Sequence, residues 1–322
     1  MKYYFAPMEG ITTHVFRAVH SRRFPGADGY YTPFFSPTSD HLFTPRELRE
    51  LTPETPCAAP VVPQILSKCA ADIVWAAEGL QDMGYTVFNL NLGCPSGTVT
   101  AKGKGAGFLA HPDELDRFLD AVFSACTVPI SIKTRLGVHD PAEFEALLEI
   151  YSRYPVAELT IHPRVRQDFY KGRVREDAFA SALPHCPMPV CYNGDLVSER
   201  GIRETIERYP SLSALMLGRG LLGDPSLVTR GRGGERAGSA RLQAFHDTLF
   251  ARYCDAFGDS RIAVLRMKEL WFYFGNLFEN SEKLQKSIKK AKNAEEFERA
   301  AAALFCSCEV RGNAVPAWFR PA

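Results

Sequence analysis

The sequence contains no apolar run long enough to cross a membrane. A spanning helix needs about 18 or more consecutive apolar residues, and no stretch of the 322 residues approaches that length. Met1 leads into residues 3–7 without a basic segment followed by a long apolar one, so we expect no secretory signal. These absences predict a protein that has no membrane partner.

The nine cysteines lack any paired spacing. Nine is an odd number, and the positions show no rhythm typical of a disulfide framework. Cys306 and Cys308 are separated by a single residue, which is not the spacing of a zinc site, and no histidine follows them. We therefore predict a reducing, cytoplasmic location and no bound metal.

The chain also lacks a large excess of charge of either sign. Its formal net charge is +1, which by itself predicts no polyanionic partner. The distribution is uneven, because residues 230–322 hold 16 Lys and Arg against 11 Asp and Glu, whereas the first 229 residues hold 22 against 26. A basic end on a slightly acidic body fits contact with a polyanion, although a solvated helical face explains it about as well.

Short apolar runs, followed by amphipathic stretches, fill the first 220 residues. The eight runs cover residues 3–6, 29–32, 61–65, 87–91, 130–133, 159–162, 190–193 and 214–217. Most lie about 30 residues apart, which is the length of one strand–helix unit. Helical spacing recurs over 72–83, 111–123, 141–154 and 198–209. Eight such units predict an α/β protein with a closed (β/α)₈ barrel.

A polar, glycine-rich segment at residues 231–238 interrupts this alternation. Beyond it the spacing is helical, over 242–257, 262–274, 281–291 and 294–305. We predict a barrel domain over 1–230, a small helical bundle over 240–308 and an irregular tail over 309–322.

Polar and glycine-rich segments follow the ends of the predicted strands. In an α/β barrel the active site forms at the carboxyl ends of the strands, so these segments are the candidates for function. They comprise residues 7–10, Gln64, 89–95, 133–135, His162, 193–195 and 218–220. Packing alone hardly explains seven such segments. We assign the histidines other than His162 to the surface or to helix ends.

The last two segments have the composition of a phosphate site. Residues 193–195 and 218–220 offer backbone N–H groups and the guanidinium of Arg219, at the usual phosphate position of this fold. Gln64 could satisfy the polar edge of a ring such as flavin. Lys133 could stabilise negative charge on a reduced flavin.

Cys94 lies in a Gly-Cys-Pro loop beyond the fourth predicted strand. Most free cysteines are buried small hydrophobic residues. The basic, glycine-rich stretch 102–107 that follows is not expected to pack as core, and is typical of a mobile lid beside a reactive group. A thiol with a pKa near ~8.5 stays mostly protonated at neutral pH, so we predict that Cys94 donates a proton.

The assembled motifs resemble the tRNA-dihydrouridine synthase family. The resemblance is carried by residues 6–12, Gln64, 91–95, 102–107, 133–135, His162, 193–195 and 218–220, which follow the order of the family. It covers about the first 220 residues, and the helical remainder matches the family's tRNA-binding domain in size and class. Glu9 departs from the pattern, since a small residue is common there, and Pro163 and Val165 interrupt a His-x-Arg-Thr-Arg run.

The resemblance implies an oxidoreductase that uses FMN and NADPH or NADH to reduce uridines of tRNA to 5,6-dihydrouridine. It implies hydride transfer from FMN N5 to C6 of uracil and protonation of C5 by Cys94. The implied FMN-binding residues are Pro7, Met8, Glu9, Gln64, Lys133, His162, Asn193, Gly194, Asp195, Gly218 and Arg219. Asn91, Arg135 and Lys102 are implied to bind the substrate. The expected partner is tRNA, and no protein partner is predicted.

Two other functions remain open. An FMN barrel reductase of the dihydroorotate dehydrogenase kind would use the same cofactor but would not need a basic helical domain. Activity on free orotate or uracil without RNA would favour it. A non-catalytic RNA-binding barrel would stay colourless after incubation with FMN.

Overall fold

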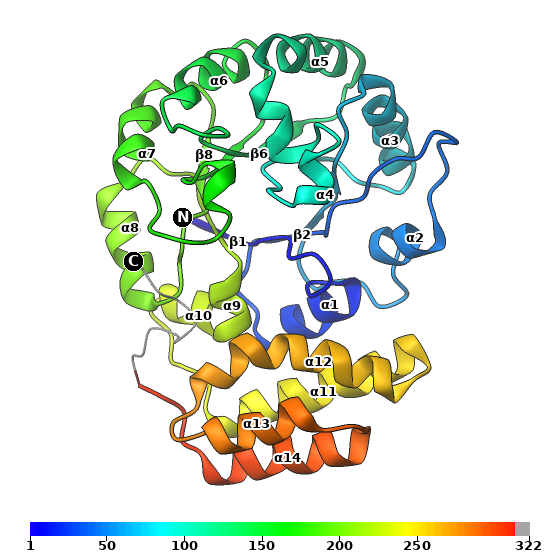
Figure 1. Cartoon of the computed structure of the whole chain (residues 1–322), viewed down its shortest axis with the longest axis vertical. Coiled ribbons are helices and arrows are strands. Elements are labelled where there is room, and N and C mark those ends of the chain that lie inside the picture. The colour runs from blue at the N-terminus through cyan, green and yellow to red at the C-terminus, as the bar shows by residue number, and fades with distance from the viewer. Residues whose placement is uncertain (313–322) are drawn as a thin grey trace.

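The computed structural model describes residues 1–312. Its sheet has nine strands in the order β3-β2-β1-β9-β8-β7-β6-β5-β4, and neighbouring strands are parallel. The strands are β1 (Lys2–Phe5), β2 (Gly29–Tyr31), β3 (Val61–Val62), β4 (Gln64–Ile65), β5 (Phe88–Leu92), β6 (Ile130–Arg135), β7 (Leu159–His162), β8 (Val190–Tyr192) and β9 (Ala214–Leu217). Figure 1 shows helices arranged in a ring around them.

The third predicted strand is broken in two at Pro63. Proline has no N–H to donate to a ladder, so it interrupts regular pairing. On one side of Pro63, β3 pairs with β2, and on the other side β4 pairs with β5. Because β3 and β4 are consecutive in the chain, the sheet returns to its starting point. The predicted (β/α)₈ barrel is therefore confirmed, and Pro63 accounts for the ninth strand.

Ten helices belong to the barrel part of the chain. They are α1 (His14–Arg23), α2 (Pro45–Leu51), α3 (Ala70–Asp82), α4 (Gly97–Thr100), α5 (Pro112–Ala125), α6 (Glu143–Tyr151), α7 (Glu176–Ala182), α8 (Glu199–Arg208), α9 (Arg219–Gly223) and α10 (Leu227–Gly231). Local caps fix several of their ends. Thr44 and Glu47 form a capping box at α2, and the Ser198 hydroxyl accepts the Gly201 N–H at the start of α8.

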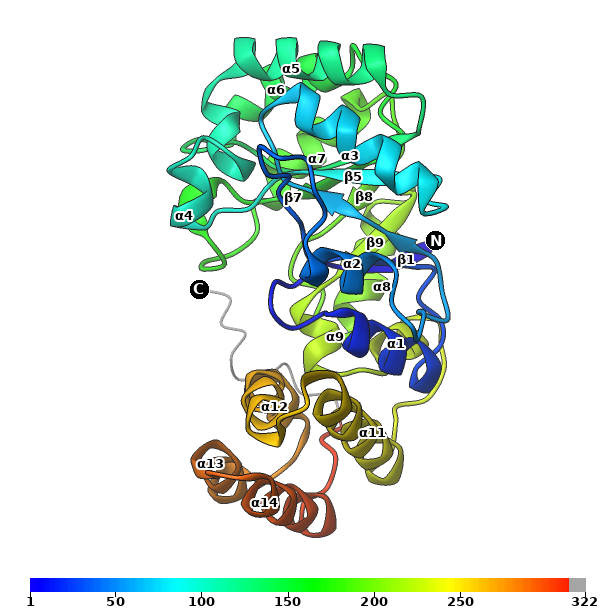
Figure 2. The ribbon, with the colours of Figure 1, turned by 90° about the vertical axis from the view of Figure 1, so that its right-hand side faces the viewer.

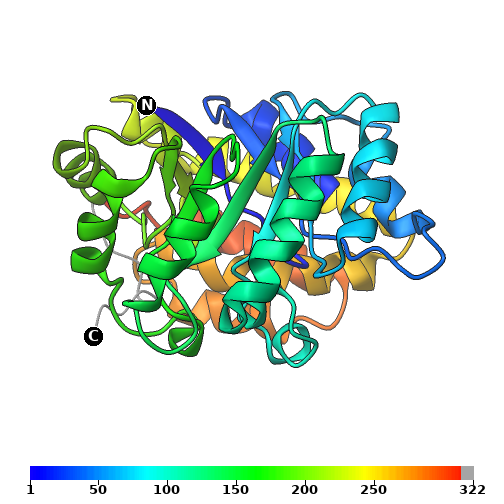
Figure 3. The same cartoon turned by 90° about the horizontal axis from the view of Figure 1, so that it is seen from above.

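Four further helices form a bundle that lies below the barrel in Figure 1 and behind it in Figure 3. They are α11 (Ser239–Phe257), α12 (Ser260–Phe274), α13 (Glu282–Lys290) and α14 (Ala294–Ser307). Residues 309–311 pair with 277–279 through backbone hydrogen bonds, and residues 313–322 of the predicted tail lie outside the described part. No helix within residues 1–312 is both long and apolar enough to span a membrane.

The helical bundle packs on the barrel around His20, in the last turn of α1. Its Nε2–H donates to the Pro225 carbonyl (3.1 Å), so its Nδ1 accepts the Tyr30 hydroxyl (2.7 Å). Burial lowers the pKa of His20 to about 3, so the ring is neutral. The Phe245 ring of α11 lies 6.1 Å away. His246, in the middle of α11, is only 1% exposed, so its predicted place at the surface or a helix end is wrong.

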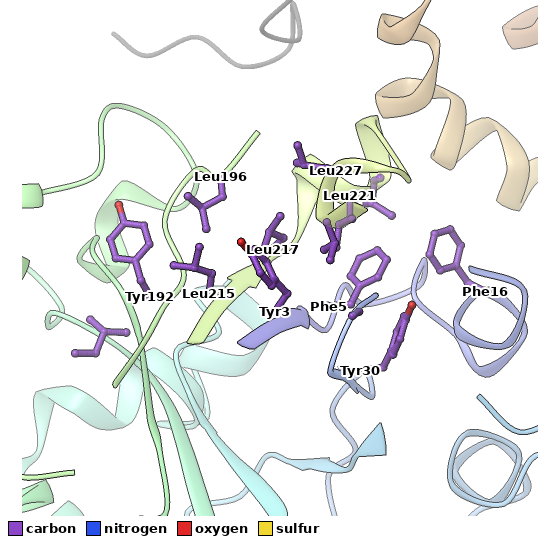
Figure 4. Packing of buried hydrophobic residues seen from close by; sticks show 14 of the residues in the cluster. Tyr3, Phe5, Phe16, Tyr30, Tyr192, Leu196, Leu215, Leu217, Leu221 and Leu227 are labelled. Atoms are coloured by element: carbon purple, nitrogen blue, oxygen red, sulfur yellow. The ribbon is translucent and has the colours of Figure 1, made fainter. Parts of the chain in front are cut away.

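The buried apolar residues form two clusters, one inside the barrel and one between the strands and the surrounding helices. The inner cluster consists of Ala6, Tyr31, Cys191, Ala214 and Met216. The outer cluster joins strands to helices, and Figure 4 shows Leu215, Leu217 and Leu221 among its members. Polar side chains follow above the inner cluster, toward the carboxyl ends of the strands, and they form the candidate site.

Candidate active site

A cavity opens at the carboxyl ends of the strands. Its space, with the open solvent at the mouth included, is about 900 Å³. The predicted residues in its lining are Pro7, Met8, Glu9, Gln64, Asn91, Cys94, Lys133, Arg135, His162, Asn193, Asp195, Gly218 and Arg219. Two predicted residues are not part of this lining. Gly194 faces a neighbouring depression, and Lys102 is exposed in the turn after α4.

Strand register explains part of this convergence. In β5 and β6, Asn91 pairs with Lys133. In β6 and β7, Arg135 pairs with His162. Paired residues of parallel strands point to the same side of the sheet, so the register alone places these side chains together at the barrel mouth.

A chain of amide groups crosses the floor of the cavity. The Asn91 side-chain N–H donates to Gln64 Oε1 (2.8 Å), and the Gln64 amide donates to Asn89 Oδ1 (2.7 Å). Asn89 in turn donates to the Ser131 hydroxyl (2.9 Å). All four side chains are buried. Each of these amides donates through its nitrogen and accepts through its oxygen, so the network fixes the orientation of all three amide groups.

The loop that carries Cys94 is held from several directions. Asn91 Oδ1 accepts the backbone N–H groups of Gly93 (3.1 Å) and Cys94 (2.9 Å). Arg135 Nε donates to the Gly93 carbonyl (2.8 Å), and the Ala106 N–H donates to the Cys94 carbonyl (3.0 Å). The thiol therefore occupies a preorganised position.

The electrostatics of Cys94 keep it protonated. Burial raises the pKa of its thiol, which outweighs the lowering by a backbone N–H and by the nearby Arg135 and Lys133. At neutral pH the side chain is therefore a thiol that can give up a proton, with two cations close enough to stabilise the resulting thiolate.

The glycine-rich stretch 102–107 packs more tightly than its sequence predicts. Ala106 and Phe108 are almost completely buried. A Cβ atom built at Gly105, whose φ is +56°, would lie 2.9 Å from the Cys94 carbonyl oxygen. The expectation that this stretch cannot pack as core is wrong for its second half, because the glycine permits a close approach to the Cys94 loop.

Lys133 is a cation without a partner. No hydrogen bond or ion pair joins its ammonium to another residue of the described chain, although the group lines the cavity. Burial and then the neighbouring Arg135 lower the pKa of Lys133 to about 8. Such an orphaned donor is suited to an anionic or electron-rich ligand.

Arg164 is the centre of a buried network beside the cavity. Its guanidinium, 1% exposed, contacts both carboxylate oxygens of Asp195 (3.0 and 2.5 Å) and His162 Nε2 (3.0 Å). It also donates to the carbonyl oxygens of Lys171 (3.2 Å) and Gly172 (2.5 Å). One side chain thus joins β7, the loop after β7 and the loop after β8.

This network determines the protonation of His162. A guanidinium can only donate, so His162 Nε2 must accept and the ring proton must lie on Nδ1. Burial, reinforced by Arg135 and Lys133, holds the pKa of His162 well below its usual range. The imidazole is therefore neutral and can donate through Nδ1.

The segments expected to bind phosphate need their glycines. A Cβ atom at Gly220 would lie 2.0 Å from the Leu196 carbonyl oxygen, so no other residue fits there without movement of the backbone. Arg219 donates to Asp195 Oδ1 (2.7 Å) and lines the cavity beside Gly218. A guanidinium and the backbone of a glycine-flanked turn therefore share this side of the cavity.

The comparison with known families decides the assignment. The family model described as "Dihydrouridine synthase (Dus)" matches residues 4–305. This chain belongs to the dihydrouridine synthase family. The resemblance predicted from the motifs is confirmed, and with it the assignment of the chain to the oxidoreductases.

Individual members of the dihydrouridine synthase family align with part of the chain. A protein of Rhodobacter capsulatus named "Probable tRNA-dihydrouridine synthase" is 30% identical over 223 residues, which are 68% of this chain and 67% of that protein. "tRNA-dihydrouridine synthase B" of Proteus vulgaris is 31% identical over 163 residues, half of each chain. The alignments thus span between half and two thirds of these relatives.

Solved structures place this dihydrouridine synthase family member among similar barrels. Morphinone reductase in complex with tetrahydroNAD matches with a TM-score of 0.52, over 73% of this chain and 88% of that one. The old yellow enzyme homologue from Zymomonas mobilis matches with a TM-score of 0.53, over 73% and 90%. Identity is 10% in both cases, so the likeness concerns the fold alone.

Tyr170 is a site residue that the sequence analysis did not select. Its ring lies 5.3 Å from the guanidinium carbon of Arg135 and 5.4 Å from that of Arg219, and 6.1 Å from the His162 ring. The available signal was the pair Phe169 and Tyr170 shortly after a strand tip, where a solvated loop usually carries polar residues.

Proposed function

We propose that this chain reduces uridines of tRNA to 5,6-dihydrouridine, with FMN bound in the cavity and NADPH or NADH as the electron donor. Family membership supports the reaction. The observation that carries the site is that the Cys94 thiol, the Lys133 ammonium and the His162 imidazole line one cavity at the barrel mouth.

The polar groups of the cavity fit FMN. It offers an unpartnered ammonium, a neutral imidazole with a free Nδ1–H and a guanidinium beside glycine backbone. The residues that would hold the cofactor are Pro7, Met8, Glu9, Gln64, Lys133, His162, Asn193, Asp195, Gly218 and Arg219, with the backbone of Gly194. When bound, FMN supplies the hydride that adds to C6 of uracil.

The protein's own residues serve the polar ends of that cofactor. The Lys133 ammonium would stabilise negative charge on the ring, and the His162 Nδ1–H would donate to a ring oxygen or to the phosphate. Arg219, already paired with Asp195, would contribute to the phosphate site. His162 and Arg219 are held by Arg164 and Asp195 before any ligand arrives, so little reorganisation of these two groups opposes binding.

Cys94 would supply the proton to C5 of uracil. Its raised pKa keeps the proton available, and the nearby cations stabilise the thiolate left behind. Asn91 and Arg135 hold the loop of Cys94 and line the same cavity, so they would orient both the thiol and the uracil. Lys102, exposed beyond α4, would contact the substrate from the side.

The helical domain would bind the tRNA backbone. Residues 230–322 carry the basic surplus of the chain, and contacts of lysine and arginine with phosphate release counterions. A cytoplasmic location, where tRNA is modified, stays a prediction.

The reaction can be tested directly on RNA. Unmodified tRNA, purified protein, FMN and NADPH should yield a product in which single uridines gain the mass of two hydrogen atoms, as seen by mass spectrometry of RNA fragments. In parallel, tRNA from cells that lack the protein should lose this increment at the same positions. Reduction of free uracil or orotate without any reduction in RNA would contradict the proposal.

The lowered pKa of Lys133 predicts that the affinity for FMN depends on pH. As the pH rises through about 8, the ammonium loses its proton and its attraction for an anionic cofactor. We expect the Kd for FMN to rise by up to about tenfold between pH 7 and pH 9. Lys133→Met should bind FMN more weakly at pH 7 and show a smaller rise.

Titrations that follow FMN fluorescence at several pH values measure both effects. Lys283→Met, which removes an exposed ammonium from α13, is the matched control and should behave like the unmodified chain. A Kd that is the same in Lys133→Met and in the control would remove Lys133 from the FMN site.

A further inference from the structure

Three of the four large aromatic side chains that are exposed in residues 1–312 are Phe169 (44%), Tyr170 (51%) and Phe272 (63%). We propose that these residues form an aromatic rim around the cavity, whose two phenylalanines stack on unpaired RNA bases that flank the target uridine. The inference rests on the proposed function and names the form in which the RNA is bound, a splayed single-stranded loop.

Contacts from α12, the helix that carries Phe272, place it beside the mouth. Arg266 of α12 donates to the carbonyl of Gly10, in the turn after β1 (3.2 Å). The Phe272 ring lies 5.0 Å from the Tyr273 ring. Burial raises the pKa of Tyr273, and Tyr170 is close enough to contribute to that shift. Figure 2 shows α12 on the side of the molecule to which α4 also projects. Because α12 also packs against α9, which begins at the cavity residue Arg219, the exposed Phe272 lies on the helix that borders the mouth.

The loop after β7 is built to present its aromatic residues outward. Phe169 has a φ of +49°, a conformation that costs a bulky residue on the order of 1–3 kcal/mol. Arg164, buried beneath the loop, holds the carbonyl oxygens of Lys171 and Gly172. The guanidiniums of Arg135 and Arg219 lie against the Tyr170 ring and hold it at the edge of the cavity.

The surroundings of the aromatic rim match RNA better than protein. The guanidiniums of Arg135 and Arg219 lie against the Tyr170 ring. Neighbouring aromatic and basic groups are typical of surfaces that bind single-stranded nucleic acid. Leu265 and Ile262 extend the exposed apolar face along α12 at helical spacing. The rim also borders the cavity that would receive an extruded base, and extrusion costs least in an RNA loop.

Binding of a stem-loop RNA tests the aromatic rim. The RNA carries the target uridine in its loop and 2-aminopurine beside it, and fluorescence of 2-aminopurine reports both stacking and Kd. Phe272→Ala should raise the Kd about tenfold, and Phe272→Tyr, which keeps a ring, should restore it. Leu48→Ala removes a similarly exposed apolar side chain from α2 and should leave the Kd unchanged.

Phe169→Gly separates binding from folding. Glycine adopts a positive φ without strain, so the variant should be at least as stable as the unmodified chain while its RNA affinity falls several-fold. A fully paired duplex of the same base composition should bind all variants equally, because its bases cannot reach the rim.

The outcomes distinguish this inference from the proposed function. If Phe272→Ala and Phe169→Gly bind the stem-loop as tightly as Leu48→Ala, the aromatic rim does not stack on RNA. If Phe272→Ala instead changes the oligomeric state and leaves RNA affinity unchanged, the rim is a protein interface and the inference is overturned. If the binding pattern holds but no RNA is ever reduced, the inference stands and the proposed reaction fails.

Discussion

Replacement of Cys94 by alanine should lower the rate of dihydrouridine formation by about 10²- to 10⁴-fold, the usual contribution of a positioned general acid. The cofactor site should remain intact, since the Cys94 loop is held through backbone groups by Asn91 and Arg135. FMN content and the rate of NADPH oxidation should therefore stay close to those of the unmodified chain. Single-turnover reduction of tRNA by pre-reduced protein isolates the step.

Two variants sharpen that experiment. Cys94→Ser retains a proton but holds it much more tightly than a thiol, so we expect a rate between those of the alanine variant and the unmodified chain. Cys306→Ala removes an exposed cysteine from α14 and should have no effect. A Cys94→Ala protein that reduces tRNA at the full rate would show that the proton comes from another group.

Replacement of Arg164 by alanine should destabilise the fold by about 2–4 kcal/mol, because two carbonyl groups lose their buried donor and the Asp195 carboxylate keeps only Arg219 as a partner. Arg164→Lys should recover only part of this loss, since an ammonium cannot reproduce a planar fork of N–H donors. Urea unfolding at neutral pH measures the loss of stability in both variants.

The position of Arg164 predicts a second effect, on His162. Without the guanidinium, Nε2 is no longer obliged to accept and one repelling cation is gone, so the pKa of His162 should rise from its very low value. Nitrogen NMR of labelled histidine reports that change. Arg175→Ala breaks a more exposed pair with Asp168 and should cost about 1 kcal/mol or less. Equal losses of unfolding free energy in Arg164→Ala and Arg175→Ala would contradict a central role for Arg164.

The positions of most cavity residues could be predicted from sequence because two regularities reinforce each other. Apolar runs about 30 residues apart define the strands, and all strands of such a barrel end at one mouth. Residues as far apart as Gln64 and Gly218 could thus be assigned to one site without knowledge of their distances. The break at Pro63 was not predicted, because residues 61–65 were treated as one strand although a proline stands in the middle of them.

Features that depend on tertiary contact could not be predicted. The sequence does not show that the side-chain oxygen of Asn91 accepts the backbone N–H groups of Gly93 and Cys94. It does not show that a Gly194 Cβ atom would lie 2.5 Å from the Tyr192 hydroxyl, so that this glycine serves packing too. Arg164 was not among the predicted site residues, since burial is a property of the surrounding fold.

The packing of α11 on α1 limits how freely the two halves of this chain can be exchanged. Phe16 and His20 of α1 lie against Phe245 of α11, so α1 packs against both the barrel and the bundle. A chimera that joins this barrel to another relative's C-terminal half should therefore need matching residues on α1. During synthesis, that face of α1 stays uncovered until the ribosome has passed residue 245.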